Sequence, residues 1–178
     1  MRIAGWVFVF FLFPCSLIAQ QFIGSAGKVT FISEAPLSTF EGISDQLNGL
    51  VDQEKGLVDF YLDLNTLKTG IGLRDKHMRD SYLETKKYPY AEFTGQLIGE
   101  INFGQPAEVK GKFKLHGVEK EVTLKGTVKK IDADTLEIDS EFQILLSDYK
   151  IDIPKVVFYE LADVQKVRVQ IQLKRKDK

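Results

Sequence analysis

The sequence predicts an all-β protein, an extended antiparallel β-barrel of about eight strands with a short helix near residues 73–83. Three observations carry this prediction. Apolar and polar residues alternate over most of the chain from Gly27 onward, which is typical of strands with one buried face. Turn-forming residues separate the alternating runs and favour consecutive hairpins. Finally, antiparallel strands of this kind either pack as a sandwich or close on themselves, and about eight of them give a barrel just wide enough for one small ligand.

Residues 1–19 have the features of a secretory signal peptide. Arg2 precedes an apolar run from Trp6 to Phe13, and the segment ends on small Ala19 after Pro14. A transmembrane helix would need about 20 unbroken apolar residues, and Pro14 interrupts this run before it reaches that length. We therefore expect an exported protein, periplasmic or secreted, with cleavage near Ala19 and a single domain over residues 20–178.

The only cysteine, Cys15, lies inside this leader. The mature domain is therefore expected to contain no disulfide and no thiolate metal site. A lipoprotein start at Cys15 is the alternative, because Leu12 lies three residues before it. Pro14 argues against that alternative, since a small residue normally precedes a lipidated cysteine.

The strands are expected in order along the chain. The first contains Val29 and Phe31, and a short second strand covers residues 37–43 or 47–51. The later strands share one apolar phase, which faces the interior. It comprises Val58, Phe60, Leu62 and Leu64; Phe93 and Leu97; Val109, Gly111, Phe113 and Leu115; Val122, Leu124 and Val128; Leu136, Ile138, Phe142 and Ile144; and Val167, Val169, Ile171 and Leu173. The opposite phase of one strand is a row of lysines, which cannot face a core.

The connections between these runs contain turn residues. They are residues 53–56, residues 104–106, the pair His116 and Gly117, and residues 132–134. Aspartates in the last of these turns are expected to bond the backbone rather than to act as acids or bases. Successive hairpins of this kind imply an antiparallel meander.

Three glycines fall on the inward phase of successive strands: Gly95, Gly111 and Gly126. They could leave space for a ligand inside the barrel. They could equally lie at bends or bulges that curve the sheet. The sequence leaves both interpretations open.

Residues 66–89 break the alternation and contain the expected helix. Leu73, Met78 and Tyr82 offer adaptable apolar surface there, and Arg74, Asp75 and His77 are candidates for a polar portal that meets a ligand head group. The alternative is purely structural, with these charged groups forming a network that frames one barrel end.

Motifs for catalysis or metal binding are missing from the sequence. There is no HExxH, CxxC, GxSxG or phosphate-binding glycine loop, and His77 and His116 are far apart in sequence. The 24 basic and 25 acidic residues leave a net charge of −1, which does not favour nucleic acid. We expect no enzyme, no metal and no resident cofactor.

Several motifs in a fixed order resemble the YceI-like family. They are Ala35-Pro36 with residues 40–43, residues 67–70, residues 74–78, residues 88–93, and residues 111–120 with the hairpin His116-Gly117. The resemblance covers about Gly27 to Leu173 and implies a lipocalin-like barrel that holds a polyisoprenoid or similar amphiphile. It supplies no catalytic residues. The chain departs from the usual pattern at residues 81–83, where a phenylalanine pair is common, and at residues 147–154.

These inferences predict non-enzymatic binding, storage or transport of a long-chain amphiphile, such as an isoprenoid quinone, polyprenol or fatty-acid-like lipid. The alternative is an envelope stress or interaction protein with a packed barrel and no ligand. Transient membrane contact is also expected. The apolar interior and portal candidates are Phe31, Phe60, Leu62, Leu64, Leu73, Met78, Tyr82, Phe93, Gly95, Gly111, Phe113, Leu124, Phe142, Ile144 and Val169. The polar portal candidates are Arg74, Asp75 and His77.

Overall fold

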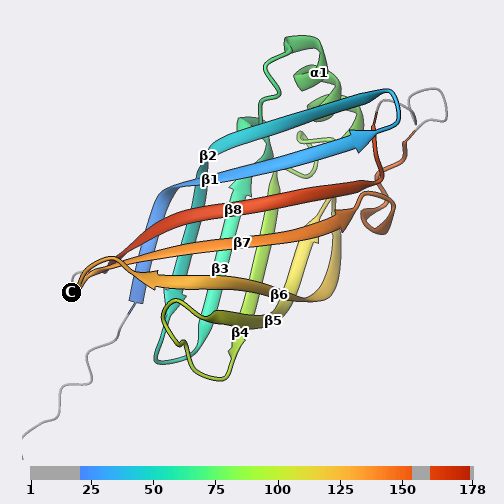
Figure 1. Cartoon of the computed structure of the whole chain (residues 1–178). Coiled ribbons are helices and arrows are strands. Elements are labelled where there is room, and N and C mark those ends of the chain that lie inside the picture. The colour runs from blue at the N-terminus through green and yellow to red at the C-terminus, as the bar shows by residue number, and fades with distance from the viewer. Residues whose placement is uncertain (1–20, 154–160, 177–178) are drawn as a thin grey trace, which may run out of the picture.

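The computed structural model describes residues 21–153 and 161–176, and within them eight antiparallel strands form a closed barrel in chain order (Figure 1). The strands are β1 (Gln21–Ala35), β2 (Ser38–Asp52), β3 (Leu57–Asp63), β4 (Tyr90–Ile98), β5 (Pro106–Leu115), β6 (Val118–Lys130), β7 (Thr135–Leu145) and β8 (Val164–Arg175). Each strand pairs with the next, and β1 also pairs with β8, which closes the barrel. The all-β prediction, the strand number and the meander are confirmed. The expected leader lies outside the described residues.

The first two strands are longer than the sequence predicted. β1 begins at Gln21, and β2 covers both of the ranges offered as alternatives. In both strands the alternation of apolar and polar residues is incomplete. In β1 the pairing register shifts on either side of Gly27, which interrupts the period-two phase. In β2 the buried positions include Gly42, Ser44 and Gly49, which carry no apolar signal.

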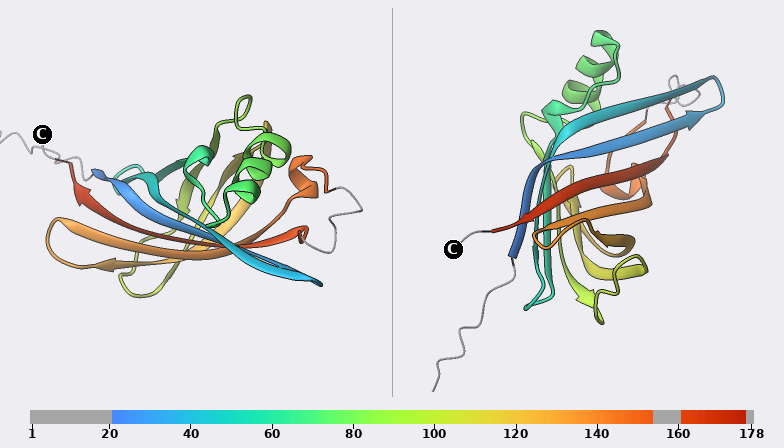
Figure 2. Two further views of the ribbon diagram at one scale, coloured as in Figure 1. Left: turned by 90° about the horizontal axis from the view of Figure 1, so that it is seen from above. Right: turned by 60° about the vertical axis from the view of Figure 1, so that its left-hand side comes forward.

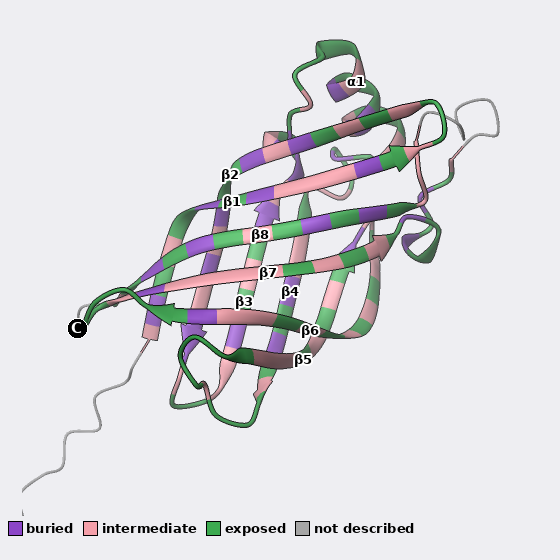
Figure 3. Ribbon diagram, viewed as in Figure 1, coloured by how far each residue is buried: buried purple, intermediate pink, exposed green. Residues whose placement is uncertain are grey.

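The expected inward and outward faces are confirmed in the later strands. Figure 3 shows buried and exposed residues alternating along them. In β5, Lys110, Lys112 and Lys114 are exposed while Leu115 is buried. Leu136 of β7 and Leu173 of β8, which are direct cross-strand partners, are among the most completely buried side chains. The core therefore lies inside the barrel.

The β5–β6 hairpin turns at His116 and Gly117, as predicted. Both residues have positive φ, 50° and 74°, which suits a two-residue hairpin turn. The His116 ring is held from two sides: its Nε2 lies 2.8 Å from Glu84 Oε2 and its Nδ1 lies 3.1 Å from the Tyr149 carbonyl oxygen. His116 thus ties the hairpin to two other segments at this end of the barrel.

The helical segment follows β3 and stands at one end of the barrel (Figure 2). It comprises a 3-10 turn η1 (Leu64–Thr66), the helix α1 (Gly72–His77) and a π-helical turn η2 (Met78–Tyr82). A separate 3-10 turn, η3 (Ser147–Tyr149), follows β7. The predicted helix near residues 73–83 is confirmed in place, although its second half is π-helical. Leu64 lies in η1 rather than in β3.

Aromatic rings occupy the space beside glycines on the inner wall. A Cβ atom on Gly42 would fall 2.1 Å from the Phe31 ring, and one on Gly49 would fall 2.3 Å from the Phe60 ring. Phe31 and Gly42 are direct cross-strand partners, as are Phe60 and Gly49. Glycines in β2, which have no side chain beyond a hydrogen, therefore leave room for the aromatic rings of β1 and β3 to pack against the sheet.

Candidate functional site

The barrel interior contains two adjoining cavities. The inner cavity has a volume of about 150 Å³. The second cavity, of about 450 Å³, lies beside the helical segment and is called the helix-end cavity below. The two share five lining residues, Val29, Leu62, Ala91, Phe113 and Val167, so they are neighbouring sections of one interior.

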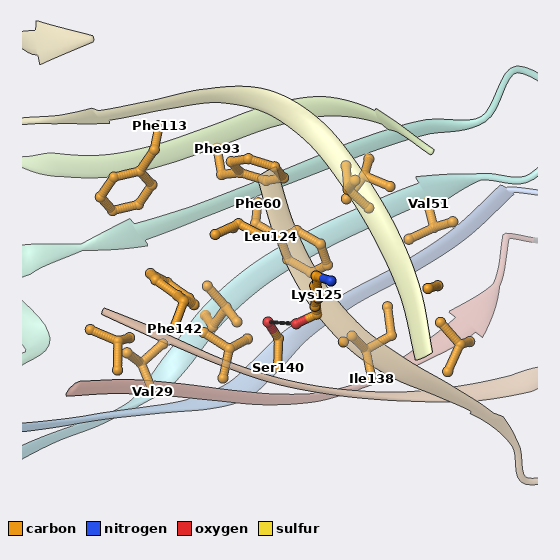
Figure 4. A pocket seen from close by; sticks show the side chains of 18 of the residues that line it. Val29, Val51, Phe60, Phe93, Phe113, Leu124, Lys125, Ile138, Ser140 and Phe142 are labelled. Atoms are coloured by element: carbon orange, nitrogen blue, oxygen red, sulfur yellow. Dashed lines mark hydrogen bonds between the residues drawn. The ribbon is translucent and has the colours of Figure 1, made fainter. Parts of the chain in front are cut away.

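The inner cavity has an almost wholly apolar wall (Figure 4). Seven of the fifteen apolar interior and portal candidates line it: Phe60, Leu62, Phe93, Phe113, Leu124, Phe142 and Val169. Ser140 also lines it, but its hydroxyl donates a hydrogen bond to the Lys125 carbonyl oxygen at 2.7 Å. The polar group is thereby satisfied by a neighbouring strand, which leaves a surface suited to a hydrocarbon.

Edge-to-face aromatic contacts fix the wall near the junction of the two cavities. The Phe113 ring meets the Phe142 ring with centroids 6.1 Å apart and the Tyr149 ring with centroids 5.6 Å apart. Such pairs are preferred geometries for aromatic side chains. Burial raises the pKa of the Tyr149 hydroxyl, and the nearby Asp148 carboxylate raises it further. Tyr149 therefore stays neutral at physiological pH.

The inward glycines divide into two kinds. Gly95 and Gly111 are direct cross-strand partners, and neither lines a cavity. A Cβ on Gly111 would fall 2.4 Å from the Thr94 carbonyl oxygen and 3.0 Å from the Phe93 ring, so these glycines make room for close strands and for that ring. The strand register is regular at both, which excludes a bulge. Gly126 alone of the three lines the inner cavity.

The helix-end cavity collects the remaining apolar candidates. Phe31, Leu64, Leu73, Met78, Tyr82 and Ile144 line it, together with Leu62 and Phe113 from the shared wall. Met78 is buried and Tyr82 is half-buried, whereas Leu73 is largely exposed. The helical segment thus forms one wall of this cavity and also its exposed rim.

Two of the three polar candidates line the helix-end cavity. Arg74 is half-buried, and its guanidinium carbon lies 4.2 Å from the centroid of the Phe40 ring. His77 also lines the cavity and is exposed. Both can meet the polar end of a ligand, although the Arg74 guanidinium is already stacked on an aromatic face.

Asp75 does not line either cavity, which corrects its placement in the portal. Its carboxylate accepts hydrogen bonds from the Thr69 backbone N–H at 2.7 Å and the Thr69 hydroxyl at 2.6 Å. Burial acts to raise the pKa of Asp75, but these hydrogen bonds and the charges of Arg79 and Lys68 outweigh it and lower the pKa overall. Asp75 therefore holds the start of α1 in place, as the structural interpretation proposed.

Several lining residues were not predicted from the sequence. Phe40 and Ile71 lie in segments without clean alternation, and both line the helix-end cavity. Gln165 is the most informative omission, because it is buried and lines the same cavity. Its Nε2 donates to the Ser33 hydroxyl, while its Oε1 accepts no hydrogen bond from any residue that the structure describes. The sequence does contain a signal for Gln165, because it is a polar residue in the same inward phase as Val167 and Val169.

Other kinds of site are not found in residues 21–153 and 161–176. No group of three or more His, Cys, Asp or Glu side chains in these ranges is arranged to hold a metal ion. No helix among these residues has the length and apolar character needed to cross a bilayer.

The family model for the YceI-like domain matches residues 21–174. A search of curated protein sequences found no significant match. Among solved structures, the chain resembles a polyisoprenoid binding domain from Saccharophagus degradans, with 19% identity, coverage of 89% of this chain and 100% of that one, and a TM-score of 0.75. It also resembles BcnA from Burkholderia cenocepacia, with 20% identity, coverage of 82% and 95%, and a TM-score of 0.69. For the YceI protein of Campylobacter jejuni the values are 19%, 76% and 85%, and 0.63. At these identities the structures establish a shared fold, and the match over residues 21–174 shows that this chain belongs to the YceI-like family.

Proposed function

We propose that this protein binds a long-chain amphiphile, such as an isoprenoid lipid, inside its barrel without chemically transforming it. The observation that carries the proposal is the pair of adjoining cavities, about 150 Å³ and 450 Å³, with largely apolar walls. Pockets for small ligands typically measure about 300–1,000 Å³. The polyisoprenoid-binding domain from Saccharophagus degradans has the same fold, which supports a lipid as the ligand.

The polarity of the two cavities supports one orientation of the ligand. The inner cavity offers aromatic and aliphatic surface, while the helix-end cavity adds Ser38, Arg74, His77 and Gln165. A hydrocarbon tail therefore fits best in the inner cavity, with the polar end among these four residues. Each CH₂ group removed from water contributes about 0.8 kcal/mol. Association costs about 4–15 kcal/mol, so a long tail is required.

Binding rather than catalysis is favoured by the state of the polar groups. Arg74 is stacked on Phe40, His77 is exposed, and Asp75 is bound to Thr69. A general acid or base would need to converge with a partner on a reacting atom. These three groups instead have separate structural roles or face solvent.

The proposal is tested by extracting the purified protein with organic solvent and analysing the extract by mass spectrometry. We expect a long-chain lipid at close to one molecule per barrel. The alternative of a packed barrel that serves only as an interaction protein predicts no lipid in the extract. It also predicts no binding when polyprenols, isoprenoid quinones and fatty acids are offered, and that pair of results would overturn the proposal.

We further propose that the protein works outside the cytoplasm, after removal of residues 1–19. Arg2, the apolar run from Trp6 to Phe13 and Ala19 support export. The strands of the barrel run from Gln21 to Arg175, so cleavage near Ala19 would leave every strand intact.

A further inference from the structure

The rim of the helix-end cavity exposes large apolar side chains. Ile71 and Leu73 both line the cavity, yet they remain 50% and 65% exposed. Leu37, at the turn between β1 and β2, is 77% exposed, and its neighbour Ser38 lines the same cavity. Figure 1 shows this hairpin and α1 at the same end of the barrel. The mouth of the cavity is therefore bordered by apolar groups that face solvent.

The segment that forms this rim also carries four basic side chains. Lys68, Arg74, Lys76 and Arg79 lie in the same segment, and none forms an ion pair with a residue that the structure describes. The lysines of β5 and β6 differ in this respect. Lys112 lies 2.8 Å from Glu119, Lys114 lies 2.7 Å from Glu92, and Lys125 lies 2.7 Å from Glu108. These lysines of the barrel wall are paired with acids, whereas the basic groups of the rim form no ion pair of this kind; Arg74 stacks on Phe40, and the charges of Lys68 and Arg79 act on the buried Asp75 carboxylate.

The segment itself contains little negative charge. The segment of residues 68–80 contains two acidic residues, Asp75 and Asp80. Asp75 is buried against Thr69 and cannot face an external partner, which leaves Asp80 as the exposed acid of the segment. Lys68, Ile71, Leu73, Arg74, Lys76 and Arg79 are together called the portal face.

We propose that the portal face docks on the surface of an anionic phospholipid bilayer. Exposed Ile71 and Leu73 would enter the interface between head groups and acyl chains, and the basic groups would lie among the lipid phosphates. A bilayer fits better than a protein partner because apolar tips and unpaired cations border the opening of a cavity suited to a lipid tail. A lipid tail could then pass from the bilayer into the barrel without crossing water. This consequence rests on the proposed function, whereas the docking itself is independent of it.

The experiment is flotation of the purified chain with vesicles of phosphatidylcholine, either pure or containing phosphatidylglycerol. We expect binding to the anionic vesicles that weakens as salt is added. Lys76→Glu should reduce this binding by about tenfold, because it reverses one charge at the surface. Leu73→Asp should reduce it at least as much, and its exposed side chain leaves little packing to lose.

Matched controls lie at the opposite end of the barrel. Ile98 is 52% exposed at the end of β4, and Lys130 is exposed at the end of β6, so Ile98→Asp and Lys130→Glu make the same chemical changes away from the portal face. Both should bind anionic vesicles like the unaltered chain. Equal losses in portal and control variants would overturn the proposal, as would absence of vesicle binding or equal binding to neutral vesicles.

Docking and ligand binding fail in distinguishable ways. Lys76 does not line either cavity, so Lys76→Glu should still yield lipid on solvent extraction. A chain that contains lipid but ignores anionic vesicles would refute docking and leave the proposed function intact. A chain that binds vesicles through the portal face but contains and accepts no lipid would refute the proposed function alone.

Discussion

The guanidinium carbon of Arg74 lies 4.2 Å from the centroid of the Phe40 ring, and this contact joins α1 to β2. The Phe40 ring in turn meets the Phe31 ring edge-on, with centroids 6.1 Å apart. All three residues line the helix-end cavity. The stacked cation and the two rings therefore connect the helical segment to β1 and β2 beside the cavity.

Arg74→Met should loosen this connection. The substitution keeps an unbranched side chain but removes the charge, and the lost cation–π contact is worth about 0.5–1 kcal/mol at such a site. We expect a decrease of that size in the free energy of unfolding in urea and faster amide exchange in α1. Lys76→Met, at an exposed neighbour, is the control. Equal effects of the two substitutions would show that the Phe40 contact is not the cause.

Gly111→Ala should destabilise the barrel by about 1–3 kcal/mol or more, because overpacking has costs of this order. The added Cβ would fall 2.4 Å from the Thr94 carbonyl oxygen and 2.6 Å from the Gly95 Cα. Gly72→Ala is the matched control, since a Cβ there meets nothing within 4 Å. It should be neutral or stabilising by about 0.4–1 kcal/mol. Urea unfolding of both variants measures the difference, and a Gly111→Ala variant as stable as the unaltered chain would contradict the structure at this strand pair.

Ala91→Phe should shorten the space available to a ligand tail. Ala91 is half-buried and lines both cavities, so a phenyl group there would obstruct their junction. We expect affinity for long isoprenoid alcohols to fall by about tenfold or more, because several CH₂ groups would lose their burial. Short-chain analogues should bind nearly as before.

Thr94→Phe is the control for this experiment, because Thr94 lies on the same strand and is exposed. Affinities can be measured by displacement of a fluorescent lipid. A uniform loss over all chain lengths in Ala91→Phe, or an equal loss in Thr94→Phe, would argue against a tail that passes between the cavities.

Asp75 should make stability depend on acid. Its folded pKa is lowered below the ordinary value of 3.8, so its charged carboxylate stabilises the folded state above that value. This contribution is lost as the pH falls below 3.8 through the folded pKa. Asp75→Asn should therefore be less stable than the unaltered chain by about 1 kcal/mol or more near neutral pH. The gap should narrow in strong acid.

Urea unfolding of both proteins at about pH 7 and about pH 3 tests this expectation. Asp80→Asn provides the control, because Asp80 is exposed in the same segment. A gap between Asp75→Asn and the unaltered chain that stays constant as the pH falls would exclude the Asp75 carboxylate as the source.

Export should depend on the apolar run of residues 6–13. Phe10→Arg places a charge in that run and should leave the chain uncleaved inside the cell. Mass spectrometry of the unaltered protein should find an N-terminus near Gln20. Recovery of the full-length chain from the envelope, with Met1 retained, would contradict cleavage.

The strands and their buried faces could be predicted from the sequence, because period-two alternation commits each strand to one buried face. Closure of the sheet into a barrel is established by the pairing of β1 with β8. The row of Lys110, Lys112 and Lys114 predicted which face of β5 is outward, and His116 with Gly117 located a hairpin. The extent of β1 and β2 became clear only from their pairing in the folded barrel. Register shifts around Gly27 and small residues such as Gly42 and Ser44 remove the apolar signal there.

The candidate site divides in the same way. Inward aromatic residues such as Phe60 and Phe142 could be named from phase alone, and both line the inner cavity. The glycines that border open space could not be identified from phase, because the Phe93 ring occupies the space beside Gly111 while Gly126 lines the cavity. Arg74 and Asp75 are adjacent charged residues that the sequence could not distinguish as portal candidates. In the structure Arg74 lines the cavity, whereas Asp75 accepts hydrogen bonds from Thr69. Local pattern sets which way a strand residue points, but contacts between distant segments determine which space stays empty and which charge stays available.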